Sequence, residues 1–309
     1  MKTYIAHKNQ IKGFNNVSET VNMVEKIAAS SVHFLKQEVF NLNVYAAEVE
    51  KILTRLSLFY QKKDNPLLQK KYTKRKTLVI LTGDKGLVGG LWHGIVNAFL
   101  KNTKQYQAII VIGAKGENYL KEENMPIIKS FTHIFDISQK KEIRYITNYI
   151  FDEFKKGVFS RVDILYPQFI SLAKQTPNLT LFLPFEFTPL EITNYDDKNA
   201  IDNKRHEQRK FLTEFKLTKR KKSSEGLPIF EPSKQKVFDK LLQKYIGVFF
   251  HKIIMETKLS ELSARAVAME HAAVKTRELI KKLTLDYTKE RRRIITQRQI
   301  ESFTAHKII

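Results

Sequence analysis

A glycine-rich turn is the first place in this sequence where the residue types could do chemistry. Residues 82–90 read Thr-Gly-Asp-Lys-Gly-Leu-Val-Gly-Gly, directly after an apolar run and before a helix-like stretch. Such a turn can cradle phosphate on backbone amides at a helix N-terminus. However, it lacks the Gly-Lys-Ser/Thr ending of a P-loop, its glycines do not fit G-x-G-x-x-G, and the carboxylate of Asp84 opposes an anion. We therefore favour a structural strand-to-helix turn over a phosphate site. The residues of this turn are Gly83, Asp84, Gly86, Gly89 and Gly90.

The other reactive residue types form no recognisable catalytic or metal-binding pattern. The eight histidines include no HExxH and no i,i+4 pair, and no serine stands in G-x-S-x-G. The absence of cysteine excludes thiol chemistry and argues against structural zinc. We predict that His251 and His271 lie on solvated helix surfaces and that Trp92 is a core or rim residue. No cofactor and no metal are expected on this chain.

Composition and charge limit the class of protein. The 309 residues carry 54 Lys+Arg against 32 Asp+Glu, a formal charge of +22, and 42% are hydrophobic. These values exclude collagen-like and disulfide-scaffold proteins and leave enough apolar residues for a core. The positive field favours an acidic partner, which could be nucleic acid, an anionic membrane surface or an acidic protein. Because Met1–Gln10 has no signal-peptide pattern and no apolar run is long enough to span a bilayer, we expect a cytosolic chain.

Heptad patterns at both ends of the chain predict two long helices. The N-terminal pattern alternates steps of four and three residues, and the C-terminal pattern runs from Leu259 to Tyr287 with the same steps. These seams predict an intramolecular antiparallel coiled coil. Beyond Tyr287, the basic run 289–293 favours a helix end that enters another protein's surface, with a solvated helix end as the alternative. The N-terminal seam consists of Val17, Val21, Val24, Ala28, Ser31, Leu35, Val39, Leu42, Ala46, Val49, Leu53, Leu56 and Tyr60.

The middle of the chain alternates short apolar runs with helix-like stretches. The apolar runs are 78–81, 108–112, 162–166 and 179–183. This alternation predicts a mainly parallel α/β sheet with helices on its faces. Residues 198–222 have a different composition, with 10 Lys/Arg against 3 Asp/Glu, and are predicted to be a basic insertion or mobile arm.

Several motifs along the chain resemble the γ subunit of F-type ATP synthases. Residues 259–272 (LSELSARAVAMEHA) and 283–291 (LTLDYTKER) are similar to that family's C-terminal signature. The turn 83–90 looks like its S-D-[KR]-G-L-C-G-G turn, residues 24–30 resemble its first helix, and Phe230-Glu231-Pro232 matches the F-E-P before its last helix. Four residues depart from the family pattern and indicate a divergent member. They are Trp92, Thr288, Arg292 and Arg298.

The resemblance implies an α/β fold class, with a long antiparallel coiled coil of the N- and C-terminal helices and a Rossmann-like α/β domain. The implied domains are an N-terminal coiled-coil helix over 1–64, the Rossmann-like foot over 65–232 with its basic insertion at 198–222, and a C-terminal coiled-coil helix over 233–309.

The resemblance also implies a function. The chain would be the central rotor shaft within a ring of alpha-like and beta-like ATPase subunits, coupling ATP hydrolysis or synthesis to rotation. It would be non-catalytic, with ATP/ADP and Mg bound on the partner subunits. It would be cytoplasmic and peripheral on the inner face of the cell membrane, with epsilon-like or membrane-sector subunits beneath the foot. The implied ring contacts are Met23, Arg265, Met269, Lys289, Arg291, Arg292 and Thr296. The implied foot contacts are Lys219, Arg220, Lys221 and Lys222.

Other functions stay open at this point. A specialised F1-like motor that is not coupled to proton transport would use the same shaft. A basic coiled-coil nucleic-acid binder would use the same charge, but it should interleave aromatic residues with Lys/Arg, whereas residues 291–293 are followed by Ile294 and Ile295. We therefore expect no direct nucleic-acid partner. A nucleotide-using enzyme would need a phosphate loop and polar catalytic groups that this sequence does not assemble.

Overall fold

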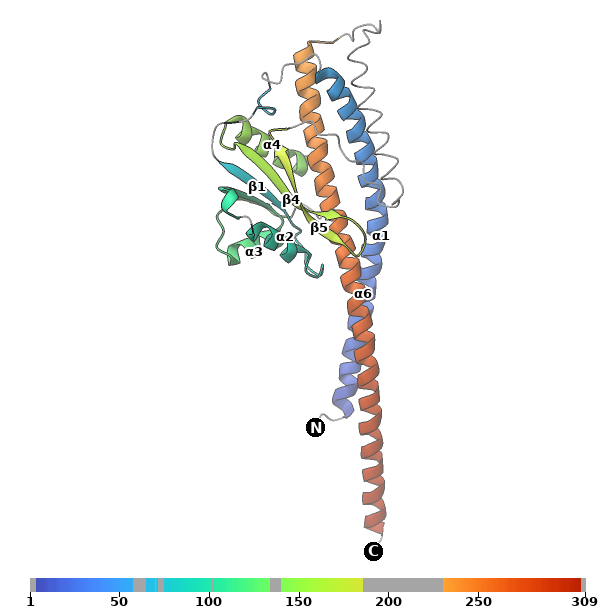
Figure 1. Cartoon of the computed structure of the whole chain (residues 1–309). Helices are drawn as coiled ribbons and strands as arrows, with labels where there is room; N and C mark the ends of the chain where they lie inside the picture. Colours follow the sequence, from blue (N-terminus) through green and yellow to red (C-terminus); the bar gives the residue numbers. More distant parts are fainter. Residues whose placement is uncertain are drawn as a thin grey trace. The chain divides into compact units, whose positions relative to one another are not determined.

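The structure, a computed structural model, describes residues 4–57, 65–69, 71, 75–101, 103–133, 140–185 and 230–306 (Figure 1). The predicted basic segment 198–222, with its foot contacts Lys219, Arg220, Lys221 and Lys222, lies outside these residues. The helices are α1 (Tyr4–Ser57), α2 (Leu91–Leu100), η2 (Thr103–Gln105), α3 (Ala114–Glu122), α4 (Lys140–Lys155) and α6 (Lys234–His306). The strands are β1 (Lys76–Leu81), β2 (Ala108–Ile112), β3 (Ile127–Phe131), β4 (Arg161–Phe169) and β5 (Gln175–Leu183).

The chain divides into two compact units, which are described separately. The helical unit comprises Met1–His33, Gly86–Gly89 and Glu261–Ile309. The sheet unit comprises Phe34–Lys85 and Gly90–Ser260. The helices α1 and α6 each contribute to both units, and the domain ranges 1–64, 65–232 and 233–309 stay a prediction.

The sheet has the order β3-β2-β1-β4-β5, in which β5 is antiparallel to β4 and the other pairs are parallel. All five residues of β2 and five of the six in β1 are buried, as expected for central strands with helices on both faces. The four predicted apolar runs lie in β1, β2, β4 and β5. The edge strand β3 was not predicted, because its residues Ile127–Phe131 are mostly exposed or half-buried and include Lys129 and Ser130.

The core of the sheet unit lies between one face of the sheet and three helices. Val79 and Leu81 of β1 belong to it, and so do residues from α1, α4 and α6. Phe182 of β5 packs in this core against Phe151 of α4 and Phe250 of α6, at centroid distances of 6.2 and 5.4 Å. The alternate residues of β1 point to the other face, where α2 buries its own apolar side chains. The sheet therefore separates two helical layers (Figure 1).

The helices α1 and α6 pair in opposite directions. In the helical unit, the rings of Tyr4 and Tyr287 lie 6.1 Å apart. In the sheet unit, the Tyr245 hydroxyl donates a hydrogen bond of 3.3 Å to Glu50 Oε2. Residue numbers thus rise along α1 while those of its partners fall along α6. The fold class of an antiparallel coiled coil plus a Rossmann-like α/β domain is confirmed.

The buried stripe of α1 follows most of the predicted seam and departs from it at some positions. Ala28, Val39, Ala46, Val49 and Leu53 are buried as predicted, whereas the assignment of Val17, which is 49% exposed, is wrong. Val32 and Asn43, which the strict heptad spacing omits, are buried as well. The reason is geometric, because a helix with 3.6 residues per turn drifts against a 3.5-residue repeat. The last predicted seam residue, Tyr60, lies outside the described residues.

The C-terminal helix α6 is one continuous element of 73 residues. It begins directly after Pro232 and Ser233, and the Ser233 hydroxyl accepts a hydrogen bond of 3.3 Å from the Lys236 backbone nitrogen. At 1.5 Å per residue the helix spans roughly 110 Å. In the described part of the chain, no helix is long and apolar enough to cross a membrane.

Candidate functional site

The glycine-rich turn after β1 caps the N-terminus of the neighbouring helix α3. The Asp84 carboxylate accepts a hydrogen bond of 2.8 Å from the Ala114 backbone nitrogen, and the Thr82 hydroxyl accepts one of 3.0 Å from Gly116. These are backbone donors of the first helical turn, which helices leave without intrahelical partners. The groups that could hold a phosphate at α3 are therefore satisfied by the chain's own side chains. This geometry agrees with a structural turn.

Two glycines allow this close contact. A Cβ atom added at Gly116 would lie 2.4 Å from the Thr82 hydroxyl, and one added at Gly113 would lie 2.3 Å from the Thr82 carbonyl oxygen. Gly113 also has φ +105°, a conformation that side chains disfavour. The glycines here bring backbone close to a threonine, whereas in a phosphate loop they make room for a ligand.

Helix α6 lies where a doubly wound sheet would bind its ligand. Such sheets bind ligands at the carboxyl ends of the strands, where the strand order reverses. Here the chain passes from β1 to β2 and β3 and then returns to β4 on the other side of β1. Beside the carboxyl end of β4, the Ser260 hydroxyl of α6 donates a hydrogen bond of 2.8 Å to the Pro167 carbonyl, and both partners are buried. The helix thus lies beside the carboxyl end of β4, next to the point where the strand order reverses.

Trp92 is a core residue, as predicted. Its side chain is 2% exposed, and its indole nitrogen donates a hydrogen bond of 3.1 Å to the Lys85 carbonyl. A buried indole with a satisfied N–H offers no face on which a base could stack. Trp92 therefore supports the start of α2 and the turn before it.

In the helical unit, a buried ion pair holds the same turn against α6. Arg265 Nη2 lies 2.6 Å from Glu261 Oε1 and donates a second hydrogen bond of 3.1 Å to the Gly86 carbonyl. Glu261 is 1% exposed and Arg265 is 9% exposed, so the pair is shielded from water. The i,i+4 spacing of Glu and Arg is visible in the sequence, but sequence reasoning missed the burial that makes the pair important.

The predicted ring contacts fall into two groups. Met23 is 62% exposed, and the C-terminal residues are exposed as well. Arg265 and Met269 are instead buried within this chain, so any influence they have on a partner would pass through the groups they position. The role of all seven as ring contacts stays a prediction. The exposed C-terminal residues are Lys289, Arg291, Arg292 and Thr296.

The paired part of the helical unit ends at the contact of Tyr4 with Tyr287. Beyond it, the side chains of α6 are exposed except for Glu290 and Ile294, which are half-buried, as far as residue 304. Arg291, Arg292 and Arg293 are followed by exposed apolar residues, of which Phe303 is 77% exposed. An exposed helix that mixes arginines with large apolar side chains has the composition of a protein-binding surface.

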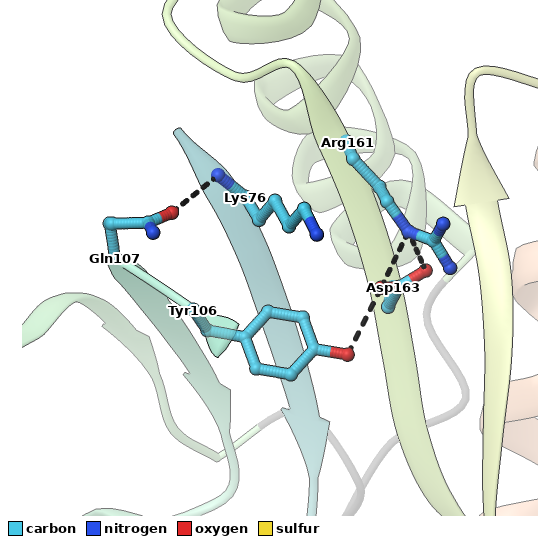
Figure 2. Close-up of polar contacts among 5 residues, drawn as sticks. All are labelled: Lys76, Tyr106, Gln107, Arg161 and Asp163. Carbon is cyan, nitrogen blue, oxygen red and sulfur yellow. Dashed lines mark hydrogen bonds and ion pairs between the residues drawn. The ribbon is translucent and has the colours of Figure 1, made fainter. Parts of the chain in front are cut away.

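A second polar cluster lies at the opposite end of the sheet (Figure 2). Asp163, which is 2% exposed, accepts hydrogen bonds from Arg161 Nε at 2.8 Å and from the Tyr106 hydroxyl at 3.0 Å. Burial raises the pKa of Tyr106 to about 12, and the Asp163 carboxylate adds to the effect. The cluster stands where β1 and β4 begin, away from the ligand-binding end of such sheets. It ties the start of β2 to β4 across β1, and sequence reasoning missed it.

A groove of about 740 Å³ in the sheet unit is lined by α1, α4 and α6. His251 lines it, and the Nε2 atom of this residue is buried, so the prediction that His251 lies on a solvated surface is wrong. His271 is exposed as predicted. Among the residues that the structure describes, no group of three or more His, Cys, Asp or Glu could hold a metal ion.

Comparison of the sequence with known proteins points to one family. The family model for ATP synthase matches residues 4–302. The ATP synthase gamma chains of Synechococcus sp. (strain RCC307) and Nostoc sp. (strain PCC 7120) are 29% and 27% identical to this chain, and each alignment covers 95% of both chains.

Solved structures support the fold. A chain of the Euglena gracilis mitochondrial ATP synthase matches with a TM-score of 0.61 at 14% identity, covering 98% of this chain and 93% of that one. A chain from the central stalk and c-ring structure of the Tetrahymena thermophila enzyme matches with a TM-score of 0.53 at 19% identity, covering 82% of this chain and 99% of that one. At these identities the likeness shows the fold alone.

The sequence match and the fold thus agree with the implied shaft, and neither the specialised motor nor the nucleic-acid binder is favoured. The family model spans nearly the whole chain, from the paired start of α1 to the exposed end of α6. The chain therefore belongs to the ATP synthase gamma chain family.

Proposed function

We propose that this gamma chain is the non-catalytic central shaft of an F1-type rotary ATPase and couples ATP hydrolysis or synthesis in a ring of alpha-like and beta-like subunits to rotation. The single observation that carries the proposal is the exposed end of α6 beyond Tyr287. Arg291, Arg292 and large apolar side chains such as Phe303 are exposed there, so they suit the interior of a partner ring.

Torque would arise from changes in the ring contacts of this end. If acidic loops of the ring approach Arg291 and Arg292 differently in each nucleotide state, each state favours a different angle of the shaft. Sequential hydrolysis then moves the preferred angle step by step. The shaft contributes position and charge to this cycle and makes or breaks no covalent bond.

The nucleotide and its Mg ion belong on the partner subunits in this proposal. The N-terminus of α3 is capped by Asp84 and Thr82, and α6 lies beside the carboxyl end of β4, so neither of these two places in the described chain offers a ready phosphate site. Equilibrium dialysis of the isolated chain with labelled ATP tests this part, and we expect no stoichiometric binding at micromolar concentration. Saturable binding of one ATP per chain would contradict it.

The complex would be cytoplasmic and peripheral on the inner face of the cell membrane, with epsilon-like or membrane-sector subunits beneath the sheet unit. The direct test of the proposal is a single-molecule assay of the purified complex, in which the ring is fixed to a surface and a bead is attached to the sheet unit. Stepwise unidirectional rotation on addition of ATP is the expected result. ATP hydrolysis by the complex without any rotation of the bead would overturn the proposal.

A further inference from the structure

The part of α6 in the sheet unit is enclosed on all sides near its end. Of the nine residues 252–260, eight are buried, and Lys258 is half-buried. A helix that packs on one side only would expose roughly half of such a stretch. Here the buried residues include the polar or charged Lys252, Glu256 and Ser260 among apolar ones. The rest of the chain therefore surrounds this segment, residues 252–260 of α6.

Hydrogen bonds fix the orientation of the helix at this buried segment. Apolar contact is non-directional, whereas a hydrogen bond constrains both distance and angle. The Ser260 hydroxyl donates to the Pro167 carbonyl of β4 at 2.8 Å, and Ser260 is 0% exposed. Nearer the start of α6, the Tyr245 hydroxyl donates a hydrogen bond to Glu50 of α1. The bond at Ser260 joins the helix directly to the sheet.

The sheet leaves the Pro167 carbonyl available for this bond. Pro167 stands opposite Pro177 in the β4–β5 register. The hydrogen bond from the Ile170 backbone nitrogen to the Lys174 carbonyl makes Pro167 and Pro177 a non-hydrogen-bonded pair, so the Pro167 carbonyl points away from β5. On the other side of β4, the register with β1 ends at Ile80 and Leu165, two residues before Pro167. A buried carbonyl without a ladder partner needs another donor, and Ser260 supplies it.

The same buried segment of α6 contains charged residues. Burial lowers the pKa of Lys252, while the carboxylates of Glu256 and Glu50 oppose this shift. Burial also raises the pKa of Tyr166 in β4, and the charge of Glu256 adds to the rise. Lys252 and Glu256 of α6 are thus electrostatically coupled to α1 and to the sheet. Charges buried this deeply tolerate few alternative arrangements, because each would leave a charge without its partner.

We infer that Ser260 is a positioning residue for torque transfer, whose hydrogen bond to Pro167 fixes the angle of α6 against the sheet so that the sheet turns with the helix. The inference rests on the proposed function of the chain as a rotor. It adds the point at which rotation passes from the long helix to the sheet that would carry the load.

The chain offers a matched control for Ser260. Ser263 lies three residues farther along α6 and is also 0% exposed, but its hydroxyl has no hydrogen-bond partner in the described part of the chain. Ser260→Ala and Ser263→Ala therefore remove the same atom from equally buried positions, and only the first breaks a bond. Ser260→Thr keeps the hydroxyl and serves as a rescue variant.

The first experiment measures the angle of α6 in the full chain. Because the chain has no cysteine, spin labels can be placed on Gln243→Cys and Ile128→Cys, two exposed positions in the sheet unit, without removing any native thiol. Loss of one buried hydrogen bond should raise the population of alternative angles about fivefold. We expect Ser260→Ala to broaden the distribution of distances between the labels, while Ser263→Ala and Ser260→Thr keep the wild-type width. Equal widths for Ser260→Ala and wild type in folded protein would overturn the inference.

The second experiment measures torsional stiffness in the assembled complex. With the ring fixed and stalled, a bead on the sheet unit should show larger angular fluctuations for Ser260→Ala than for Ser263→Ala, at unchanged ATPase activity without load. Wild-type fluctuations for Ser260→Ala would reject the role in torque transfer. Absence of rotation in the wild-type complex would instead reject the proposed function, so the two failures are distinguishable.

Discussion

The carboxylate of Asp84 caps helix α3, since Asp84 Oδ1 accepts a hydrogen bond of 2.8 Å from the Ala114 backbone nitrogen. A negative side chain at a helix N-terminus both satisfies an unpaired N–H and interacts favourably with the helix dipole. We expect Asp84→Ala to lower the free energy of unfolding by about 1 kcal/mol. Urea denaturation of the isolated chain measures this, with Glu122→Ala, which removes an exposed carboxylate at the other end of α3, as the control. Equal effects of the two substitutions would contradict the capping role.

The exposed arginines of α6 give the second prediction. Charge-assisted hydrogen bonds across an interface are worth about 1.5 to 3 kcal/mol each. The double substitution Arg291→Ala/Arg292→Ala should therefore slow ATP turnover and rotation of the assembled complex while the isolated chain stays folded. Lys281→Ala/Lys282→Ala removes two exposed charges from the same helix before Tyr287 and serves as the control. Unchanged turnover in the arginine variant would favour a merely solvated helix end.

The Tyr106–Asp163 hydrogen bond predicts a change of stability with alkaline pH. The pKa of Tyr106 is about 12 in the folded chain, above its ordinary value of 10.0. A group whose pKa is raised by folding contributes stability that is complete below the unfolded pKa and is lost as the pH rises through the folded one. Between pH 10 and 12 the wild type should thus lose more stability than Tyr106→Phe. Denaturation curves at pH 9 and pH 11 measure the difference, and Tyr145→Phe, at an exposed ring, should behave as wild type.

The basic segment 198–222 gives a prediction that rests on the sequence alone. Its excess of seven positive charges, ten minus three, is too polar for a core. Deletion of the segment should leave the ATPase activity of the soluble complex intact and weaken its attachment to the subunits or membrane sector beneath the sheet unit. Co-sedimentation of the complex with its native membranes measures this. If the deletion prevents assembly of the ring, the segment has a different role.

The elements that were predictable from the sequence are those whose patterns are long or continuous. The heptads of α1 and α6 repeat over many turns and predict a helix that is buried along one stripe. The apolar runs of the central strands β1 and β2 predict strands that are buried on both faces. The strand β3 escaped because an exposed edge needs no such run. The buried stripe of α1 also includes Val32 and Asn43, which were not predicted, because spacing alone does not reveal where a helix drifts against its partner.

The chemistry of the site was predictable only in part. Asp84 was recognised as unfavourable for an anion, but its positive role at Ala114 depends on two segments thirty residues apart that meet only in the fold. Ser260 and Pro167 are 93 residues apart in the sequence, and no local pattern around either residue predicts the hydrogen bond between them. Such pairings depend on tertiary packing, which a periodic pattern predicts in outline without specifying individual partners.

Because α6 is continuous, the number of residues along it fixes the direction in which its C-terminal side chains point. Each residue of an α-helix advances the azimuth by about 100°, so one residue inserted after Tyr287 would leave the paired seam in place and swing Arg291 and Arg292 about 100° around the axis. Four inserted residues would bring them back to within about 40° of their original azimuth, one turn farther along. The number of residues between Tyr287 and the arginines therefore sets the angle at which these side chains would meet each ring subunit. A single inserted residue would change that angle without disturbing the fold.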